Sequence, residues 1–389
     1  MPARASGGPR VLSLRELNRA TLARQLLLRR ARLDVTDAVE RLTPLQAQWS
    51  PSPYLALWAR LSRFRIADLE SALETRDVLK ATLMRGTLHL VTRREYPMYA
   101  ALITRAREAL WRSYLERAGV DLARIRPRLL AYAAEPRTRA ELTEHVEKIT
   151  RVDWTKHKYG ARPVLLAAGG LVHPARSARW GSFRSAGLIA AEKWIGAHAL
   201  PPEREAYAAI VRRYLAAFGP ASLADVGSWG GIRVAGPLRQ AVEDLAAELV
   251  ELRDDKGRVL HDLRRAPRPG ADAEAPVRFL PKWDQLLLAY APAERVRVLP
   301  ERYRRAVIAV NGDVSPTVLV DGTVAARWDA RVVSGTAVVR VDPLGRLSKA
   351  DRTAIAEEGE RLARFVHPDA KASGVRFGDV AAYNLGIRP

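Results

Sequence analysis

The sequence predicts an α+β fold, in which three tandem winged-helix units, each a helix-turn-helix followed by a β-wing, precede a C-terminal β-rich unit. Two observations lead to this prediction. Helical patterns followed by a pair of short strands recur three times, in residues 13–120, 121–200 and 201–265. Beyond a Pro-, Gly- and Ala-rich linker at residues 266–276, strand patterns dominate residues 277–389.

The first unit follows a Pro-, Gly- and Arg-rich segment, residues 1–12, which we expect to be disordered. Apolar residues at helical spacing predict four helices: residues 14–28, a helix capped by Asp34 or Thr36 that reaches residue 42, residues 54–61 and residues 66–73. Two strands, at residues 79–84 and 87–91, flank Arg85-Gly86 and predict a hairpin.

The second and third units repeat this order. In the second, a capping box at Thr138-Arg139-Ala140-Glu141 begins one helix, Gly169-Gly170 ends another at 159–168, and wing strands follow at 171–173 and 180–183. The third has helices at 203–217, from Ser222 to Gly230-Gly231 and at 237–245, then a hairpin of strands 249–252 and 259–263. This order is typical of nucleic-acid-binding units.

The C-terminal unit is predicted to be a small sheet closed by a helix. Its strands are expected at residues 307–310, 317–320, 323–327 and 336–341. Asn311-Gly312 and Asp321-Gly322 lie between strands and are strong signals for tight hairpin turns. Residues 348–365 form the predicted closing helix.

The protein is strongly basic, with a net charge of +21 and a sequence pI of about 10.8. Arginine supplies 55 of the 64 basic residues, and its planar guanidinium matches phosphate geometry better than lysine does. The charge therefore favours a polyanion, with nucleic acid as the first candidate and a membrane surface as the second. A membrane-surface helix would need a wide apolar face beside its charges, which the arginine-rich segments do not have.

Several classes of function have no support in the sequence. The absence of cysteine excludes disulfides, thiolate metal sites and cysteine nucleophiles. The histidines show no metal-binding spacing, and neither a phosphate-binding glycine loop nor a GxSxG nucleophile motif occurs. We therefore expect no metal and no cofactor. No apolar run approaches a signal core or a membrane span, so we expect a soluble, cytoplasmic protein.

Two glutamines, Gln46 and Gln48, stand in a proline-rich stretch at residues 42–54. They share a face if the backbone is extended, but lie about 200° apart around a helix. Each side-chain amide offers a carbonyl acceptor and two N–H donors, so a converging pair can hold and orient a water molecule without carrying charge. The alternative is that both are surface amides or backbone caps.

Three sequence blocks resemble the bacterial winged-helix DNA glycosylases of the AlkZ/YcaQ type. The first is Gln46-Ala47-Gln48-Trp49 followed by Pro53-Tyr54-Leu55-Ala56-Leu57-Trp58-Ala59-Arg60. The second is Leu83-Met84-Arg85-Gly86-Thr87-Leu88-His89-Leu90-Val91. The third is Leu299-Pro300-Glu301-Arg302-Tyr303-Arg304-Arg305 with Pro316-Thr317-Val318-Leu319-Val320-Asp321-Gly322. The resemblance extends from Leu14 to Asp369, and these blocks in this order are specific.

The resemblance implies that Gln46 and Gln48 are the catalytic pair of a monofunctional DNA glycosylase. In the YcaQ group the second position is aspartate, so Gln48 resembles the AlkZ group. An aspartate could act as a general base, whereas an amide only positions water and supplies weaker dipolar stabilisation. Amides suffice when the leaving group is already activated. N7-alkylguanine and N3-alkyladenine are such groups, because their positive charge is lost when the base leaves.

The implied product is an abasic site without strand scission, because no lysine or N-terminal amine is placed to form a Schiff base. Relatives of this kind handle bulky adducts or interstrand crosslinks, which implies an open cleft instead of a snug pocket. The implied roles are base excision repair and resistance to a DNA-alkylating antibiotic. The sequence does not indicate which DNA lesion is the substrate or which alkylating antibiotic is involved.

Two groups of residues are candidates for contact with double-stranded DNA. Arg85, Thr87 and His89 lie on or beside the first wing, with packing of His89 on the sheet as the alternative. Tyr303, Arg304 and Arg305 are the second group, with ordinary surface charge as the alternative. The resemblance also implies that a C-terminal hairpin reaches the minor groove, and the Asp321-Gly322 turn is one candidate.

Two further interpretations remain open. Asp284 and Asp329 stand in conspicuous Trp-Asp pairs, and salt bridges with arginine are the preferred explanation for them. The alternative function is a non-enzymatic winged-helix DNA-binding protein, a regulator or an adduct-binding protein, which tandem wings would suit equally well. We expect a monomer, because the chain itself supplies several contact modules.

Overall fold

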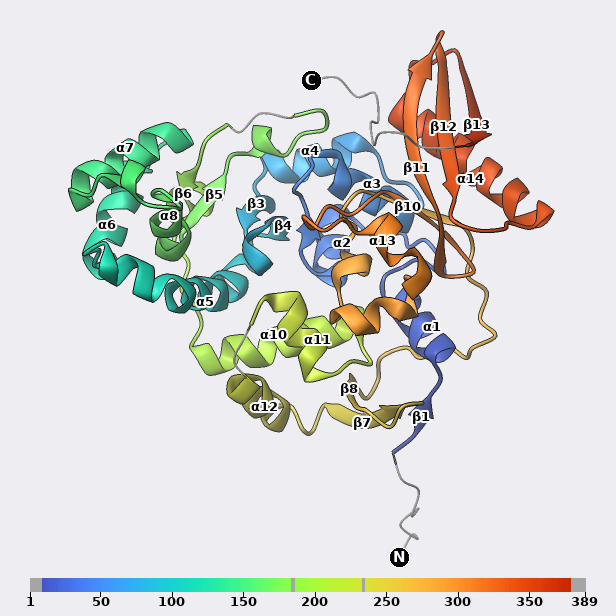
Figure 1. Ribbon diagram of the computed structural model, residues 1–389, viewed down its shortest axis with the longest axis horizontal. Coiled ribbons are helices and arrows are strands. Elements are labelled where there is room, and N and C mark those ends of the chain that lie inside the picture. Colours follow the sequence, from blue (N-terminus) through green and yellow to red (C-terminus); the bar gives the residue numbers. More distant parts are fainter. Residues whose placement is uncertain (1–8, 183–185, 233–234, 379–389) are drawn as a thin grey trace, which may run out of the picture.

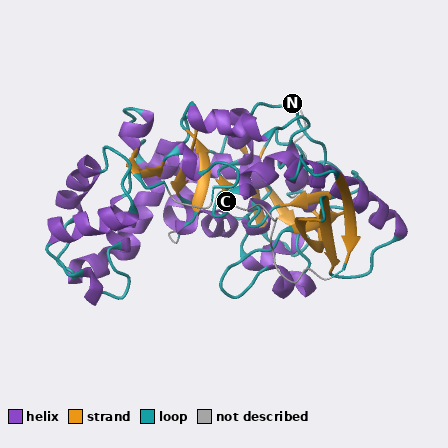
Figure 2. Ribbon diagram, turned by 90° about the horizontal axis from the view of Figure 1, so that it is seen from above, coloured by secondary structure: helices purple, strands orange, loops and turns teal. Residues whose placement is uncertain are grey.

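A computed structural model describes residues 9–182, 186–232 and 235–378 of the protein (Figure 1). Helices are combined with sheets whose strand pairs are mostly antiparallel, in agreement with the predicted α+β class. Helices α6 to α8 lie at one end of the molecule and the C-terminal sheet lies at the other (Figure 2). The elements of residues 13–95 lie between them and contact the second unit, the third unit and the C-terminal unit.

The N-terminal elements largely match the sequence prediction. Their bounds are α1 Leu14–Arg24, α2 Val35–Leu42, β2 Leu45–Gln46, α3 Pro51–Arg60, α4 Ile66–Glu74, β3 Val78–Thr82 and β4 Leu88–Thr92. Asp34 caps α2, as one of the two alternatives predicted. Helix α1 ends earlier than expected because Leu26 takes a left-handed conformation, with φ of 57°.

The prediction that residues 1–12 are disordered is wrong for the last two residues of that segment, which form a strand. Strand β1, Val11–Leu12, pairs in parallel with β7 of the third unit. The outer edge of β7 offers unpaired backbone groups, and Val11 and Leu12 pair with them. Residues 1–8 lie outside the described residues.

A single five-stranded sheet joins the first two predicted units. Its order is β2-β4-β3-β5-β6, in which β3 pairs antiparallel with both β4 and β5. Helix α5, Tyr96–Arg117, ends the first predicted unit and leads to the second. The elements of the second unit are α6 Leu122–Tyr132, α7 Arg139–Thr150, α8 Arg162–Ala168, β5 Leu171–His173, β6 Ile189–Ala190 and α9 Ala191–Ile195. The predicted capping box at the start of α7 is present.

The wing strand predicted at residues 180–183 is wrong. The partner of β5 is β6, and Trp180 and Gly181 lie in a turn, while Phe183 falls outside the described residues. The ring of Trp180 packs at 5.4 Å from Tyr54 and 5.9 Å from Phe365, measured between ring centroids. The aromatic side chain thus packs against distant segments of the chain, which the local pattern could not indicate.

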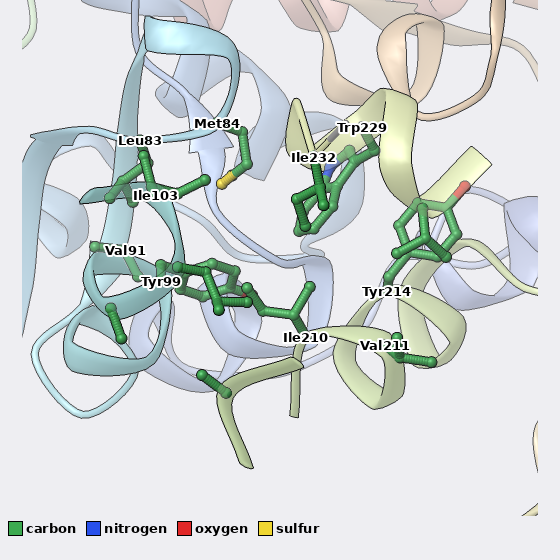
Figure 3. Close-up of a cluster of buried hydrophobic side chains, with 14 of the residues drawn as sticks. Leu83, Met84, Val91, Tyr99, Ile103, Ile210, Val211, Tyr214, Trp229 and Ile232 are labelled. Carbon is green, nitrogen blue, oxygen red and sulfur yellow. The ribbon is translucent and has the colours of Figure 1, made fainter. Parts of the chain in front are cut away.

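The third unit contains α10 Glu203–Phe218, α11 Leu223–Gly230, α12 Ala235–Asp244, β7 Leu249–Asp254 and β8 Val259–Leu263. The predicted hairpin of β7 and β8 is confirmed. Figure 3 shows how this unit packs on the first: Trp229 lies between Tyr214 of α10 and the side chains of Met84 and Tyr99, and its ring centroid is 6.3 Å from that of Tyr99. The hydrophobic core is therefore continuous across the predicted boundaries.

The C-terminal sheet has the order β13-β12-β11-β10-β9. Its elements are β9 Arg278–Leu280, α13 Arg304–Val307, β10 Thr317–Val320, β11 Thr323–Val333, β12 Thr336–Pro343, α14 Lys349–Val366 and β13 Ala372–Phe377. The strand predicted at 307–310 is wrong, because Val307 ends a helix and is buried in the core. Ile308 pairs with Val314 in an isolated bridge.

The two acidic residues singled out in the sequence form ion pairs, as preferred. Asp284 accepts two hydrogen bonds from the Arg60 guanidinium, at 2.8 and 2.9 Å, and both side chains are fully buried. Asp329 pairs with Arg331 and Arg340. The Arg60–Asp284 pair fixes α3 to the C-terminal unit. Within the described residues, no helix is both long and apolar enough to cross a membrane.

Candidate active site and nucleic-acid interface

The glutamine pair lies at the edge of the five-stranded sheet. Strand β2 pairs antiparallel with β4 so that Gln46 is opposite His89, and the N–H of Ala47 donates to the carbonyl of Leu88 at 2.7 Å. The N–H of Leu88 in turn donates to Oε1 of Gln48 at 3.2 Å. Strand β2 ends at Gln46 and the chain bends at Gln48, so the extended geometry expected for the whole pair is present only at Gln46.

The two side chains differ in exposure. Gln46 is only 5% exposed, whereas Gln48 is exposed. Oε1 of Gln46 accepts a hydrogen bond from Nη2 of Arg85 at 3.2 Å. Each amide oxygen therefore has one donor already and keeps a second lone pair, which a water molecule could use. Amides fixed in this way are preorganised acceptors with no net charge.

Arg85 connects the glutamine pair to the third unit. It lies in a 3-10 turn, Met84–Gly86, with a left-handed φ of 54°. Its Nη1 donates to the carbonyl oxygen of Trp229 near the end of α11. Although Arg85 is partly exposed, surrounding protein lowers the pKa of its guanidinium to about 10, and the positive charge of Arg295 contributes to this lowering. Arg85 therefore remains charged at neutral pH.

A close backbone contact holds the same junction. A Cβ atom at Gly231 would lie 3.2 Å from the backbone nitrogen of Arg85, and Gly231 itself has a positive φ of 70°. Both conditions favour glycine at this position. The end of α11 is thereby packed directly on the β3–β4 turn.

The predicted DNA contact by His89 is contradicted by its burial. His89 is 2% exposed, and its Nδ1 lies 3.0 Å from the carbonyl oxygen of Thr87. Because a carbonyl oxygen can only accept a hydrogen bond, Nδ1 is the donor. Burial, with the charges of Arg85 and Arg107, lowers the pKa of His89 to about 3. The imidazole is neutral and packed on the sheet. Thr87 is half-buried, and its hydroxyl donates to the carbonyl of Met84 at 3.1 Å.

The C-terminal candidates lie in a helical segment before β10. Tyr303 is half-buried under Arg302, whose guanidinium carbon lies 4.7 Å from the ring centroid. Arg304 donates to Glu301 at 2.7 Å, and Arg305 is exposed. The charge of Arg304 contributes to the lowered pKa of Arg295, which acts in turn on Arg85. Arg295 of the C-terminal unit therefore lies close enough to Arg85 for their charges to interact.

A cavity of about 340 Å³ lies beside Gln48. Its walls include residues of α5, α7 and α8, among them three arginines that the sequence analysis did not select: Arg107, Arg139 and Arg162. No signal in the sequence could distinguish them from the other arginines, because they come from three different helices. Among the described residues, no group of three histidine or acidic side chains is placed to hold a metal ion.

Comparison with known proteins decides the family. The family described as DNA glycosylase AlkZ-like matches this chain over residues 39–365. The chain belongs to the AlkZ-like DNA glycosylase family. This confirms the resemblance found in the sequence and makes the protein an enzyme of the DNA glycosylase class. The match covers the glutamine pair, the third unit and most of the C-terminal sheet.

Two comparisons match this AlkZ-like glycosylase to proteins of Streptomyces sahachiroi. The interstrand DNA cross-link repair glycosylase of that organism is 28% identical over 342 residues, covering 79% of this chain and 85% of the relative. The solved structure of the Streptomyces sahachiroi DNA glycosylase AlkZ superimposes with a TM-score of 0.76 at 23% identity, covering 95% of this chain and all of that one. The second comparison shows that the fold is shared.

Proposed function

We propose that this AlkZ-like glycosylase hydrolyses the N-glycosidic bond of cationic alkylated purines in double-stranded DNA, with Gln46 and Gln48 as the catalytic pair. The observation that carries the proposal is the fixed orientation of both amide oxygens, one by Arg85 and one by the N–H of Leu88. Two oriented acceptors can hold a water molecule by its protons and direct its oxygen lone pair outward.

The proposed reaction needs no general acid. The C1′–N bond breaks, and its electron pair goes to the purine, which thereby loses the positive charge that alkylation gave it. Water adds through its oxygen to the oxocarbenium-like C1′ and releases a proton to solvent. The protein positions water, and the amide dipoles stabilise positive charge on the sugar. N7-alkylguanine and N3-alkyladenine meet the requirement for a leaving group that is already charged.

The proposed reaction is monofunctional and leaves an abasic site. Lys80 is the buried lysine of the catalytic sheet, and burial lowers its pKa to about 8. Its Nζ donates to the carbonyl of Ser177 at 2.9 Å. Lys80 is opposite Leu90 while its neighbour is opposite His89, so the lysine points to the face of the sheet away from Gln46. Borohydride should therefore trap no covalent enzyme–DNA adduct.

We also propose bulky adducts and interstrand crosslinks as substrates, with roles in base excision repair and in resistance to a DNA-alkylating antibiotic. The name of the Streptomyces sahachiroi relative, an interstrand DNA cross-link repair glycosylase, supports the part of this proposal that concerns crosslinks. Gln48 is exposed beside a cavity, which suits a lesion too large for a closed pocket. We further propose that the protein is a cytoplasmic monomer. It would contact duplex DNA through three winged-helix units, at residues 13–120, 121–200 and 201–265.

The DNA-contacting hairpin is proposed at Ile308–Val314 and not at Asp321-Gly322. The latter turn packs on α1, where Asp321 binds Arg15 at 2.6 Å and the carbonyl of Gly322 accepts from Asn18 at 2.8 Å. Val310, at the tip of the other turn, is fully exposed. This turn directly follows α13, which contains Arg304 and Arg305, two of the residues predicted to contact DNA.

The test is excision from duplex DNA that carries a single N7-alkylguanine. We expect base release by the wild-type protein and a loss of about 100-fold or more in the Gln46→Ala, Gln48→Ala double variant, because positioning of the nucleophile is worth several kcal/mol. Circular dichroism and duplex binding serve as controls for folding. Full activity of the double variant would remove the glutamine mechanism, and inactivity of the wild type on every cationic lesion would remove the substrate class.

A further inference from the structure

The cavity beside Gln48 carries positive charge and no negative charge on its described walls. Arg107 of α5, Arg139 of α7 and Arg162 of α8 line it, together with the hydroxyl-bearing side chains of Thr138 and Thr143. None of its described lining residues is aspartate or glutamate. The cavity wall is therefore a local concentration of basic side chains.

Two arginines of α5 differ in whether they pair with a carboxylate. Arg105 of α5 forms an ion pair with Glu203 at 3.0 Å. Arg107, two residues later, instead donates its Nη2 to the carbonyl oxygens of Thr82 and Leu83, at 2.9 and 2.7 Å. In the described part of the chain, neither Arg107 nor Arg162 forms an ion pair with a carboxylate. The two backbone carbonyls hold the Arg107 guanidinium in place without neutralising its charge.

The uncompensated charges interact with each other. Burial lowers the pKa of Arg107 to about 10, and the neighbouring charge of Arg162 contributes to this lowering. Arg107 stays protonated at neutral pH, so its half-buried guanidinium lies near the like charge of the exposed Arg162, which is unfavourable in the free protein. The carboxylate at the start of α7, Glu141, already accepts from the backbone and hydroxyl of Thr138, both at 2.7 Å.

We propose that this cavity binds a phosphodiester group of the DNA strand that carries the damaged purine, with Arg107 and Arg162 as its ligands. This rests on the proposed function, because the phosphate would place the attached sugar beside Gln48. Guanidinium groups form two parallel hydrogen bonds with phosphate oxygens, and a group already fixed in place loses little entropy on binding. Apolar walls, such as Leu83, Ile103 and Leu165, exclude water and strengthen the contact.

The site also suits the reaction. The enzyme must hold the sugar still while an oriented water attacks, and a rigid anchor one phosphate away from C1′ provides that restraint. Arg107 and Arg162 belong to the second predicted unit or the helix leading to it, whereas Gln48 belongs to the first. A phosphate bound here would therefore fix the damaged strand between the two units.

The experiment measures binding of undamaged duplex DNA, so its outcome does not depend on glycosylase activity. The variants are Arg162→Gln and Arg107→Gln, and the matched control is Arg105→Gln, on the same helix as Arg107. For each, the dissociation constant is measured between about 50 and 300 mM salt, where counterion release makes affinity vary steeply. Arg162 is exposed, so its variant tests the proposal even if Arg107→Gln is unstable.

We expect the slope of log affinity against log salt to fall by about 0.9 for each phosphate that a variant no longer neutralises. Arg162→Gln should show this fall, and Arg105→Gln should keep the wild-type slope. Arg162→Lys should keep the slope but bind more weakly, because it retains the charge and lacks the fork. A wild-type slope in Arg162→Gln, or an equal fall in Arg105→Gln, overturns the proposal. Full excision by the Gln46→Ala, Gln48→Ala variant, together with a reduced slope in Arg162→Gln, would overturn the glutamine mechanism and not the phosphate site.

Discussion

Arg85 donates a hydrogen bond of 3.2 Å from Nη2 to Oε1 of Gln46. The same guanidinium binds the carbonyl oxygen of Trp229, so a single side chain connects the catalytic candidate to the third unit. The bond orients the Gln46 amide, because only its oxygen can accept from a guanidinium. Arg85, predicted from the sequence to contact DNA, thus forms hydrogen bonds within the protein, and we propose that it positions the Gln46 amide.

Substitution of Arg85 should impair the chemical step more than DNA binding. Arg85→Gln removes a charge-assisted hydrogen bond, worth about 1.5–3 kcal/mol, so the single-turnover excision rate should fall about 10- to 100-fold. Combining Arg85→Gln with Gln46→Ala should give little further loss, since both act through the same amide. Multiplicative losses in this double-variant cycle would show that Arg85 acts independently of Gln46.

A second substitution tests whether Gln48 works as a hydrogen-bond acceptor. Gln48→Glu keeps the side-chain length and an oxygen that can accept from the N–H of Leu88, so excision of N7-alkylguanine should stay within about tenfold of wild type. Gln48→Leu keeps the size and removes both polar atoms, so the rate should fall about 100-fold. The measurement is single-turnover base release, and equal rates for the two variants would contradict a water-positioning role.

The buried histidines should make stability depend on pH. His89 and His173 both have a pKa lowered to about 3 by burial, against about 6.5 in the unfolded chain. Their titration costs nothing above pH 6.5 and destabilises the folded state increasingly as the pH falls from 6.5 toward 3, because the unfolded state then binds protons that the folded state does not. Each should contribute on the order of 1 kcal/mol per pH unit in that window.

The measurement is the free energy of unfolding at pH 7, 6 and 5, above the range where carboxylates titrate. The variants His89→Gln and His173→Gln should show a weaker decline than the wild type, whatever their stability at pH 7. Excision itself should be independent of His89 protonation between pH 5 and 8, since its imidazole stays neutral. A decline as steep in both variants as in the wild type would assign the pH dependence to other groups.

The buried Arg60–Asp284 pair should be critical for stability. Asp284→Ala leaves a guanidinium unpaired in the core and should lower the free energy of unfolding by about 3–5 kcal/mol. The control is Glu248→Ala, which breaks an exposed pair with Arg212 at 2.7 Å and should cost less than about 1 kcal/mol. Chemical denaturation compares the two, and similar small losses would mean that α3 is held to the C-terminal unit by apolar packing.

Local patterns were sufficient for most elements of the fold. Helix caps at Asp34, Thr138 and Ser222 and the β7–β8 hairpin were predicted because the relevant hydrogen bonds join residues only a few positions apart. The predictions failed where a side chain packs far along the chain. Trp180 resembled a strand residue but packs on Tyr54 and Phe365, and Val307 resembled a strand residue but ends α13 in the core.

The sequence by itself determined the basic charge, the α+β class, the family resemblance and the glutamine pair, since these depend on composition or on short continuous motifs. Only the tertiary structure decided that His89 is buried and neutral, that Arg85 binds Gln46, and that Arg107 and Arg162 share a cavity whose described walls hold no carboxylate. Those relationships join residues tens of positions apart. They are set by the packing of helices on a shared sheet, which no local pattern records.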